Sequence, residues 1–271
     1  VCYNSPVLTH NRQKGCRSMT SIFFSPRGTT KKTARAILGH QEKVLERDLL
    51  GRPLTEEWTL PAGEPVLVSM PVYAGRIPSI CREMLLAHLK GHGNPAIAVA
   101  VYGNRDYDDA LVELQDLLEE NGFCVIAGAA FVAQHSIFTK VAAGRPDEDD
   151  RRRMAEFGAM CREKLSGFDP DAHTPIHIKG NRPYKKAKGV PFQPECNQNC
   201  MKCYACAKNC PTHSIPLETP WLTRTDTCIS CGACIYLCPT QARGYRGPVF
   251  EVAAKGFEAM CAKRREPELF F

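Results

Sequence analysis

The sequence predicts an α/β protein with a doubly wound, five-stranded parallel sheet, followed by a small, cysteine-rich α+β domain. Three observations support this prediction. Five apolar, strand-sized segments alternate with segments of helical period over residues 19–166. Eight cysteines then form two copies of one motif between residues 200 and 238. Between these parts, residues 167–194 are rich in Pro, His and Lys without helical period, so a basic linker is expected there.

The first strand is expected at residues 20–25, a short run with β-branched and aromatic side chains. It leads into the turn 25–30 (S-P-R-G-T-T) and then into a helix. Such a turn predicts an anion site, because backbone N–H groups and hydroxyls at a helix start face a phosphate. The turn has neither the P-loop sequence nor G-x-G-x-x-G. An ordinary capped helix start is the alternative.

Four further strands complete the predicted sheet, with the first of them at an edge: residues 44–50, 66–70, 96–102 and 123–130. Helices are expected after the third and fourth strands and at residues 147–165. Parallel sheets of this kind have right-handed crossovers and bind ligands at the carboxyl ends of their strands. The loops that end the first, third and fourth strands are therefore expected to form one site.

The cysteine motifs predict iron–sulfur clusters. Each copy reads C-x-x-C-x-x-C-x-x-x-C-P, and the second lies 28 positions after the first. Two-residue gaps let one turn present three thiolates to a cubane, and the fourth cysteine of such a run binds the neighbouring cluster. The motifs therefore predict two [4Fe–4S] clusters, cluster 1 on Cys200, Cys203, Cys206 and Cys238, and cluster 2 on Cys228, Cys231, Cys234 and Cys210.

Zinc and disulfides are the other uses of closely spaced cysteines. Zinc ribbons pair two C-x-x-C knuckles across a longer gap, which differs from three close thiols followed by C-P. Disulfide frameworks suit small secreted domains, whereas this chain has 271 residues and no export signal in its first eighteen. We expect a reducing, cytoplasmic location. No apolar run reaches the roughly 18 residues that span a bilayer, so no membrane partner is expected.

The net charge of +6 is concentrated in the C-terminal part. Residues 1–170 carry 21 basic and 21 acidic side chains, and residues 171–271 carry 14 and 8. A basic domain can indicate nucleic-acid binding. Because each cluster with four thiolates carries a charge of about −2, two clusters offset most of this excess. Nucleic acid is therefore not expected as a partner.

Both halves resemble known families. Residues 196–245 are similar to the bacterial two-cluster ferredoxins, and residues 19–165 to the flavodoxins, whose FMN lies on loops at the three strand ends above. The whole chain resembles the flavodoxin–ferredoxin fusion proteins of anaerobes. With the resemblance, the chain is expected to divide into a flavodoxin-like FMN domain at 19–166 and a ferredoxin domain with two clusters at 195–247. Met19 directly before the first strand indicates an extension at 1–18, composition indicates the linker at 167–194, and a C-terminal helix is expected within 248–271.

The resemblance also implies the residues that bind FMN. The phosphate would be held by Ser25, Arg27, Gly28, Thr29 and Thr30. One side of the isoalloxazine would be lined by Pro71, Val72, Tyr73, Ala74 and Gly75, and the other by Tyr102, Gly103, Asn104, Arg105, Asp106 and Tyr107.

Three arginines depart from flavodoxins, which tend to be acidic near the flavin. Arg27, Arg76 and Arg105 would favour anionic reduced flavin and raise its potential. Alternatively, Arg76 and Arg105 pair with nearby acids. The linker lysines either steer an acidic redox partner, lie against the phosphate, or are simply solvated.

Other reactive side chains have weaker assignments. His135, Tyr73 and Arg76 are candidates for catalysis or proton transfer, although such a histidine often only satisfies local hydrogen bonds. Cys196 is interpreted as a spare thiol. The cysteines on apolar faces are expected in the core, namely Cys81, Cys124, Cys161 and Cys261.

The predicted function is electron transfer between two [4Fe–4S] clusters and FMN, which couples one-electron and two-electron chemistry. Redox partner proteins are expected, and a homodimer is left open. The alternative is an FMN-dependent reductase of a small substrate, fed by its own ferredoxin domain. A third hypothesis makes the N-terminal domain an interaction module without flavin.

Overall fold

The computed structural model describes residues 18–41 and 43–271. The expected extension at 1–18 lies outside the described residues, apart from Ser18. No helix in the described part combines the length and apolar character needed to cross a membrane.

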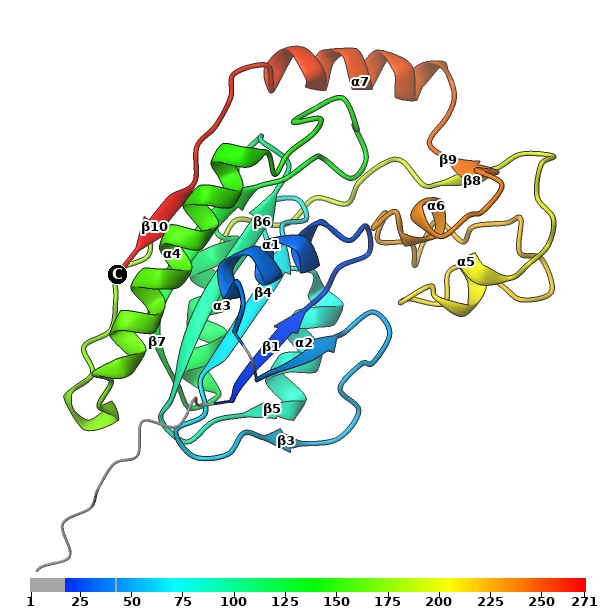
Figure 1. Cartoon of the computed structure of the whole chain (residues 1–271). Helices are drawn as coiled ribbons and strands as arrows, with labels where there is room; N and C mark the ends of the chain where they lie inside the picture. Colours follow the sequence, from blue (N-terminus) through cyan, green and yellow to red (C-terminus); the bar gives the residue numbers. More distant parts are fainter. Residues whose placement is uncertain (1–17, 42) are drawn as a thin grey trace, which may run out of the picture.

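A six-stranded sheet forms the centre of the fold (Figure 1), in the order β10-β7-β6-β4-β1-β2. The five strands β1, β2, β4, β6 and β7 are parallel to one another. In chain order they are arranged 2-1-3-4-5, which is the flavodoxin-like order. The predicted fold class is therefore confirmed, with β2 at the edge as expected. The bounds are β1 Met19–Phe23, β2 Val44–Asp48, β4 Val66–Pro71, β6 Asn94–Tyr102 and β7 Phe123–Val132.

Helices cover both faces of this sheet. On one face, α2 (Ser79–His88) and α3 (Ala110–Glu120) bury Leu85 and Leu111 against Val68. On the other face, α1 (Thr29–Leu38) and α4 (Glu148–Ser166) bury Ile37 and Phe157 with residues of β1, β4 and β6. The two hydrophobic cores are what the apolar runs of the central strands predict, because those strands are covered on both sides.

The C-terminus adds an element that the sequence analysis missed. Helix α7 (Pro248–Met260) ends earlier than the expected C-terminal segment, and the chain continues into β10 (Glu268–Phe270). β10 pairs antiparallel with β7, so the sheet has a sixth strand (Figure 1). Two short parallel strands, β3 (Trp58–Thr59) and β5 (Leu89–Lys90), form a separate pair.

The segment expected as a linker is attached along the flavodoxin-like domain. It has one turn of 3-10 helix, η1 (Pro170–Ala172), and is otherwise irregular. The buried carboxylate of Asp109 accepts hydrogen bonds from the N–H groups of Asn181 (2.8 Å) and Lys185 (2.7 Å). Ile178 is buried in the core beside α3. The basic side chains Lys179, Arg182 and Lys185 form ion pairs with Glu268, Asp116 and Asp108.

The cysteine-rich part is built from two equivalent halves. Helices α5 (Ala205–Lys208) and α6 (Ala233–Tyr236) lie 28 positions apart, and β8 (Glu195–Cys196) pairs antiparallel with β9 (Arg243–Gly244). Positive φ angles recur at the same spacing, at Lys202 and Ser230, at Tyr204 and Gly232, and at His213 and Gln241. The sequence repeat is therefore also a repeat of backbone conformation.

Candidate functional site

Residues 25–30, which we call the phosphate turn after their predicted role, join β1 to α1. The Ser25 hydroxyl accepts a hydrogen bond from the Lys31 N–H (2.9 Å), and Gly28 has a φ of 78°, a left-handed conformation that glycine adopts without strain. Ser25 therefore caps the helix start, as the alternative interpretation supposed. The N–H groups of Thr29 and Thr30 have no hydrogen-bond partner among the described residues. They leave the helix N-terminus open, as the predicted anion site would require.

Two adjoining hollows lie at the carboxyl ends of the parallel strands. The smaller, about 50 Å³, is lined by Arg27, Thr29 and Thr30 and continues along the ends of β4, β6 and β7. The larger, about 430 Å³, is lined by the loops after the same three strands. Both include Val72, Tyr73, Tyr102, Gly103, His135 and Ser136. The hollow beside the predicted phosphate site and an aromatic-lined cavity therefore join, an arrangement that FMN would require. We call the larger one the ring cavity.

The loop after β4 is a tight turn that points its residues at the ring cavity. Tyr73 and Arg76 exchange backbone hydrogen bonds of 2.8 and 3.1 Å. Ala74 and Gly75 between them have φ angles of 52° and 86°. At Gly75 a Cβ would lie 2.3 Å from the Asp108 carboxylate, so this position excludes a side chain. Tyr73, Ala74 and Gly75 all line the ring cavity, and Pro71 lines the smaller hollow.

His135 forms part of the wall where β7 ends. Its Nδ1 accepts hydrogen bonds from the N–H groups of Ile137 and Phe138, both 3.1 Å. Burial, with Arg105 and Arg27 adding repulsion, lowers the pKa of His135 to about 4. The imidazole is therefore neutral at pH 7, and its proton lies on Nε2. Gly103 makes room for the imidazole ring of His135, because a Cβ at position 103 would lie 2.4 Å from His135 Cδ2.

Of the other proposed catalytic residues, Tyr73 lines the cavity and Arg76 does not. Burial, with neighbouring Cys231, Cys81 and Tyr245 adding to it, raises the pKa of Tyr73 well above its ordinary value, so the phenol stays protonated. Arg76 binds Glu113 through two hydrogen bonds of 2.7 and 2.6 Å and lies over the Tyr184 ring at 4.6 Å. Glu113 thus neutralises the charge of Arg76, which is not among the residues that line the ring cavity.

The other two arginines differ from each other. Arg105 lines the ring cavity but forms an ion pair with Asp108. Arg27 donates from Nη1 to the Ser136 carbonyl (2.9 Å) and has no carboxylate partner in the described part of the chain. The expected effect of three cations on the flavin therefore reduces to Arg27.

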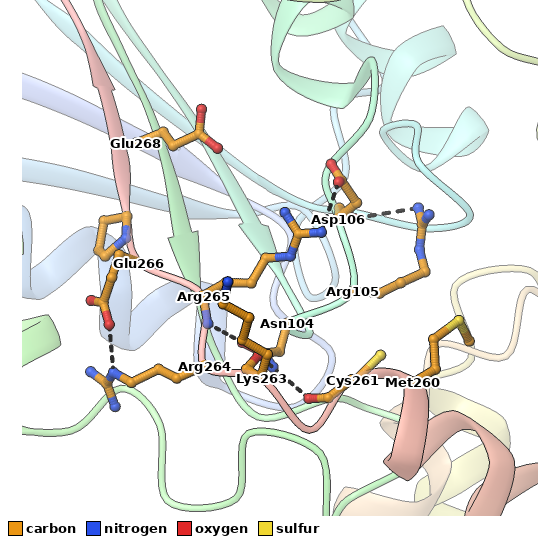
Figure 2. Close-up of a pocket in the computed structure, with 11 residues that line it drawn as sticks. Asn104, Arg105, Asp106, Met260, Cys261, Lys263, Arg264, Arg265, Glu266 and Glu268 are labelled. Atoms are coloured by element: carbon orange, nitrogen blue, oxygen red, sulfur yellow. Dashed lines mark hydrogen bonds and ion pairs between the residues drawn. The ribbon is translucent and has the colours of Figure 1, made fainter.

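Several predicted ring residues lie toward a neighbouring pocket of about 750 Å³, formed between the loop after β6 and residues 260–268 (Figure 2). Asn104 donates to the carbonyls of Cys261 (2.8 Å) and Lys263 (2.9 Å) and accepts from the Arg265 N–H. Asp106 faces Arg265 at 3.3 Å, although it also borders the ring cavity. Tyr107 is buried and donates to Glu268 (2.8 Å). The side chains of Asn104 and Tyr107 therefore anchor the C-terminal segment.

The cavity has walls that the sequence analysis did not assign. They come from Phe138 after β7, residues 188–192 of the linker segment, and Phe257 and Met260 of α7. The Phe138 and Phe257 rings stack with centroids 4.6 Å apart, and His135 packs edge-on against Phe257 at 4.9 Å. No local pattern predicts contacts between residues more than a hundred positions apart. The apolar face of α7 was the one available signal.

The predicted ligands of each cluster lie near one another in the structure. All four predicted ligands of cluster 1 line one small hollow, Cys238 from the second motif included. For cluster 2, Cys210 of the first motif lies close enough to Cys228 and Cys231 to raise the pKa of both thiols, after the larger effect of burial. The N–H groups of Ser214 and Ala242 donate to the sulfurs of Cys210 and Cys238, each at 3.2 Å. Such bonds stabilise thiolate ligands, so the donor set fits the clusters. Cys196, which the sequence analysis interprets as a spare thiol, lines the same hollow as the four predicted cluster 1 ligands.

The cluster 2 motif directly adjoins the phosphate turn. Cys231 lines the smaller hollow together with Arg27, Thr29 and Tyr73. A Cβ at Gly232 would lie 3.1 Å from Arg27 Cδ, and one at Gly28 would lie 3.4 Å from the Tyr236 hydroxyl. Ile229 and Ser230 line the ring cavity. Residues 229–232 therefore separate the predicted cluster 2 from the cavity.

Comparisons with known proteins agree with this division. The family model of the 4Fe-4S dicluster domain matches residues 199–242. No curated protein matches the chain significantly. Three solved structures illustrate the likeness of the N-terminal part.

A flavodoxin from the domain Archaea is 15% identical, with 55% of this chain and 99% of that one covered and a TM-score of 0.39. Oxidised flavodoxin 1 from Bacillus cereus is 16% identical, with 56% and 99% covered and a TM-score of 0.41. The apo form of an NADH:FMN oxidoreductase is 16% identical, with 58% and 94% covered and a TM-score of 0.39. At these scores the fold assignment rests on the strand order. The chain thus joins a flavodoxin-like fold to a ferredoxin-type 4Fe–4S domain, as expected.

Proposed function

We propose that the chain is an electron-transfer protein that passes electrons between two [4Fe–4S] clusters and FMN. Bound clusters supply one-electron steps and bound FMN supplies one- or two-electron steps. The observation that carries the proposal is that Cys231, a predicted cluster ligand, lines the same hollow as the phosphate turn and Tyr73. Electrons would therefore cross between the two centres without leaving the protein.

Different residues would bind the phosphate of the flavin and line the cavity for its ring. Thr29 and Thr30 offer free N–H groups to the phosphate, and Arg27 adds a positive charge beside them. Tyr102, Phe138 and Phe257 give the ring cavity apolar walls. Neutral His135 keeps a proton on Nε2 for hydrogen bonding at the wall. The linker segment and α7 border the cavity and limit its exposure to water.

The proposal is tested by purifying the full chain without oxygen and measuring its iron, sulfide and flavin contents. We expect about eight irons and one FMN per chain, and an EPR spectrum of two interacting clusters on reduction. With crossed ligand sets, we expect Cys210→Ala to lose cluster 2 and keep cluster 1. Cys238→Ala should lose cluster 1 and keep cluster 2. A chain that binds four irons, or zinc, or no flavin after reconstitution contradicts the proposal.

The second candidate is an FMN-dependent reductase of a small substrate. It is favoured by Lys188, a cation at the ring cavity that could hold an anionic group. A reduced, fully loaded protein that is reoxidised by small anionic electrophiles in a saturable manner would favour this activity. Reoxidation by carrier proteins alone would favour the first proposal.

A further inference from the structure

The two cysteine motifs present equivalent loops, and one of them is already docked. Residues 229–232 of the second motif lie against the flavodoxin-like domain and the linker segment. The Ser230 hydroxyl donates to the Phe192 carbonyl (2.5 Å), and Gly232 lies beside Arg27. In the helix that follows, the Tyr236 hydroxyl lies next to Gly28 of the phosphate turn. The second loop therefore covers cluster 2 with a contact inside the protein.

The corresponding loop of the first motif, residues 201–204, is open. Because the repeat is 28 positions, Met201, Lys202 and Tyr204 take the places of Ile229, Ser230 and Gly232. Met201 is 64% exposed and Tyr204 is 40% exposed. Cys203, a predicted ligand of cluster 1, is exposed as well, whereas its counterpart Cys231 is buried. The two loops share their backbone conformation. They differ in that the second loop contacts the flavodoxin-like domain and the linker segment, whereas the first is exposed.

Apolar side chains extend this open surface. Trp221 is 42% exposed and Leu222 is 53% exposed, on the segment between the motifs. The Lys202 ammonium lies over the Trp221 ring, 5.2 Å from its centroid. Lys208 takes the place of Tyr236 and is also exposed. Exposed aromatic and apolar groups rimmed by cations are typical of a protein interface.

We propose that residues 201–204, with Lys208, Trp221 and Leu222, form the docking surface for an acidic one-electron carrier protein. This inference rests on the proposed function. It adds the place of electron exchange and the order of the two clusters along the route. The argument for an external protein is the repeat itself, because the equivalent loop makes such a contact with the flavodoxin-like domain. The argument for an acidic partner is charge, since Lys202 and Lys208 are the only charged side chains of residues 200–210 besides the cysteines that would bind the clusters, and both lysines are exposed.

The order of the two clusters along the route follows from the difference in exposure between Cys203 and Cys231. Cluster 1 has the exposed ligand Cys203, and cluster 2 has the ligand that lines the hollow of the phosphate turn. In each docking event the reduced carrier would lose one electron and cluster 1 would gain it, with no bond made or broken. The electron would then pass to cluster 2 and on to the flavin, and two such events would deliver a pair. Reverse flow would use the same route.

The test compares charge reversal at this surface with an equal change elsewhere. The variant is Lys202→Glu/Lys208→Glu, and the control is Lys186→Glu/Lys255→Glu, which reverses two exposed lysines of the linker segment and α7. Both reduce the net charge equally. The probe is an acidic two-cluster ferredoxin, and binding to the loaded full chain is measured by calorimetry at low and high salt. Electron transfer is followed separately with that ferredoxin and with dithionite.

We expect the surface variant to bind the ferredoxin about tenfold more weakly and to lose most of the salt dependence, with the control close to wild type. Dithionite should reduce wild type and both variants alike, which shows that the clusters and the flavin route are intact. Failure of dithionite to reduce a flavin in the wild type would instead count against the proposed function. Equal weakening in both variants, no binding of the acidic carrier, or self-association that only the surface variant abolishes would overturn the docking proposal.

Discussion

At the scale of single residues, the ring cavity depends on how His135 is held. Its Nδ1 is occupied by two backbone N–H groups, and its ring is packed between Phe138 and Phe257. Arg105 and Arg27 oppose a positive charge at this position. The sequence predicts His135 at a strand end, and the structure has it just after β7 on the wall of the ring cavity. Its protonation state could not be predicted, because it depends on burial by residues of three separate segments.

The pKa of His135 makes the stability of the protein depend on pH. The folded-state pKa is about 4, whereas an unfolded histidine has a pKa of about 6.5. Below pH 6.5 the unfolded chain therefore binds a proton that the folded chain excludes. The contribution is complete above pH 6.5 and is lost as the pH falls toward 4, by on the order of 3 kcal/mol.

This dependence is measured by comparing the unfolding of wild type with that of His135→Asn, whose amide oxygen can accept the same backbone N–H groups. We expect the two stability curves to converge as the pH is lowered from 7 to 4.5. Parallel curves over that range would show that His135 does not titrate in this way.

At the scale of elements, predictability follows the range of the interactions that fix each one. The strands β6 and β7 were expected because their continuous apolar runs show burial on both faces. Helix α4 was expected from its acidic first turn, and Asp147 and Asp150 indeed form a capping box. β10 has three residues and becomes a strand only beside β7, so no local pattern indicates it. Likewise, the basic segment 167–194 is positioned by Asp109 and Asp116, which are distant in sequence.

Helix α7 shows how such a distant element completes the site. Its inner face packs Phe257 on Phe138 and His135, whereas Val252 on the same helix is 73% exposed. We expect Phe257→Ala to lower the free energy of unfolding by about 2–3 kcal/mol and to weaken FMN binding about tenfold by opening the cavity. Val252→Ala should leave both unchanged. Flavin fluorescence titration and urea unfolding measure the two effects, and equal FMN affinities in the two variants would exclude α7 as a wall of the flavin site.

At the scale of the whole molecule, Arg27 links three parts of the protein. It belongs to the phosphate turn, donates to Ser136 after β7 and contacts Gly232, which follows Cys231. A cation at this position attracts both an FMN phosphate and the electron that cluster 2 would gain. The proposed cluster 1, whose predicted ligand Cys203 is exposed, would serve as an internal reference.

We therefore expect Arg27→Gln to weaken FMN binding about tenfold and to shift the potential of cluster 2 to more negative values, with a smaller shift at cluster 1. Arg27→Lys keeps the charge but loses the fixed geometry of the guanidinium. It should weaken FMN binding and leave the potential of cluster 2 close to wild type. An EPR-monitored redox titration gives both potentials, and fluorescence gives the affinity. Equal shifts of the two clusters in Arg27→Gln, or a full shift in Arg27→Lys, would mean that Arg27 does not couple the flavin site to cluster 2 through its charge.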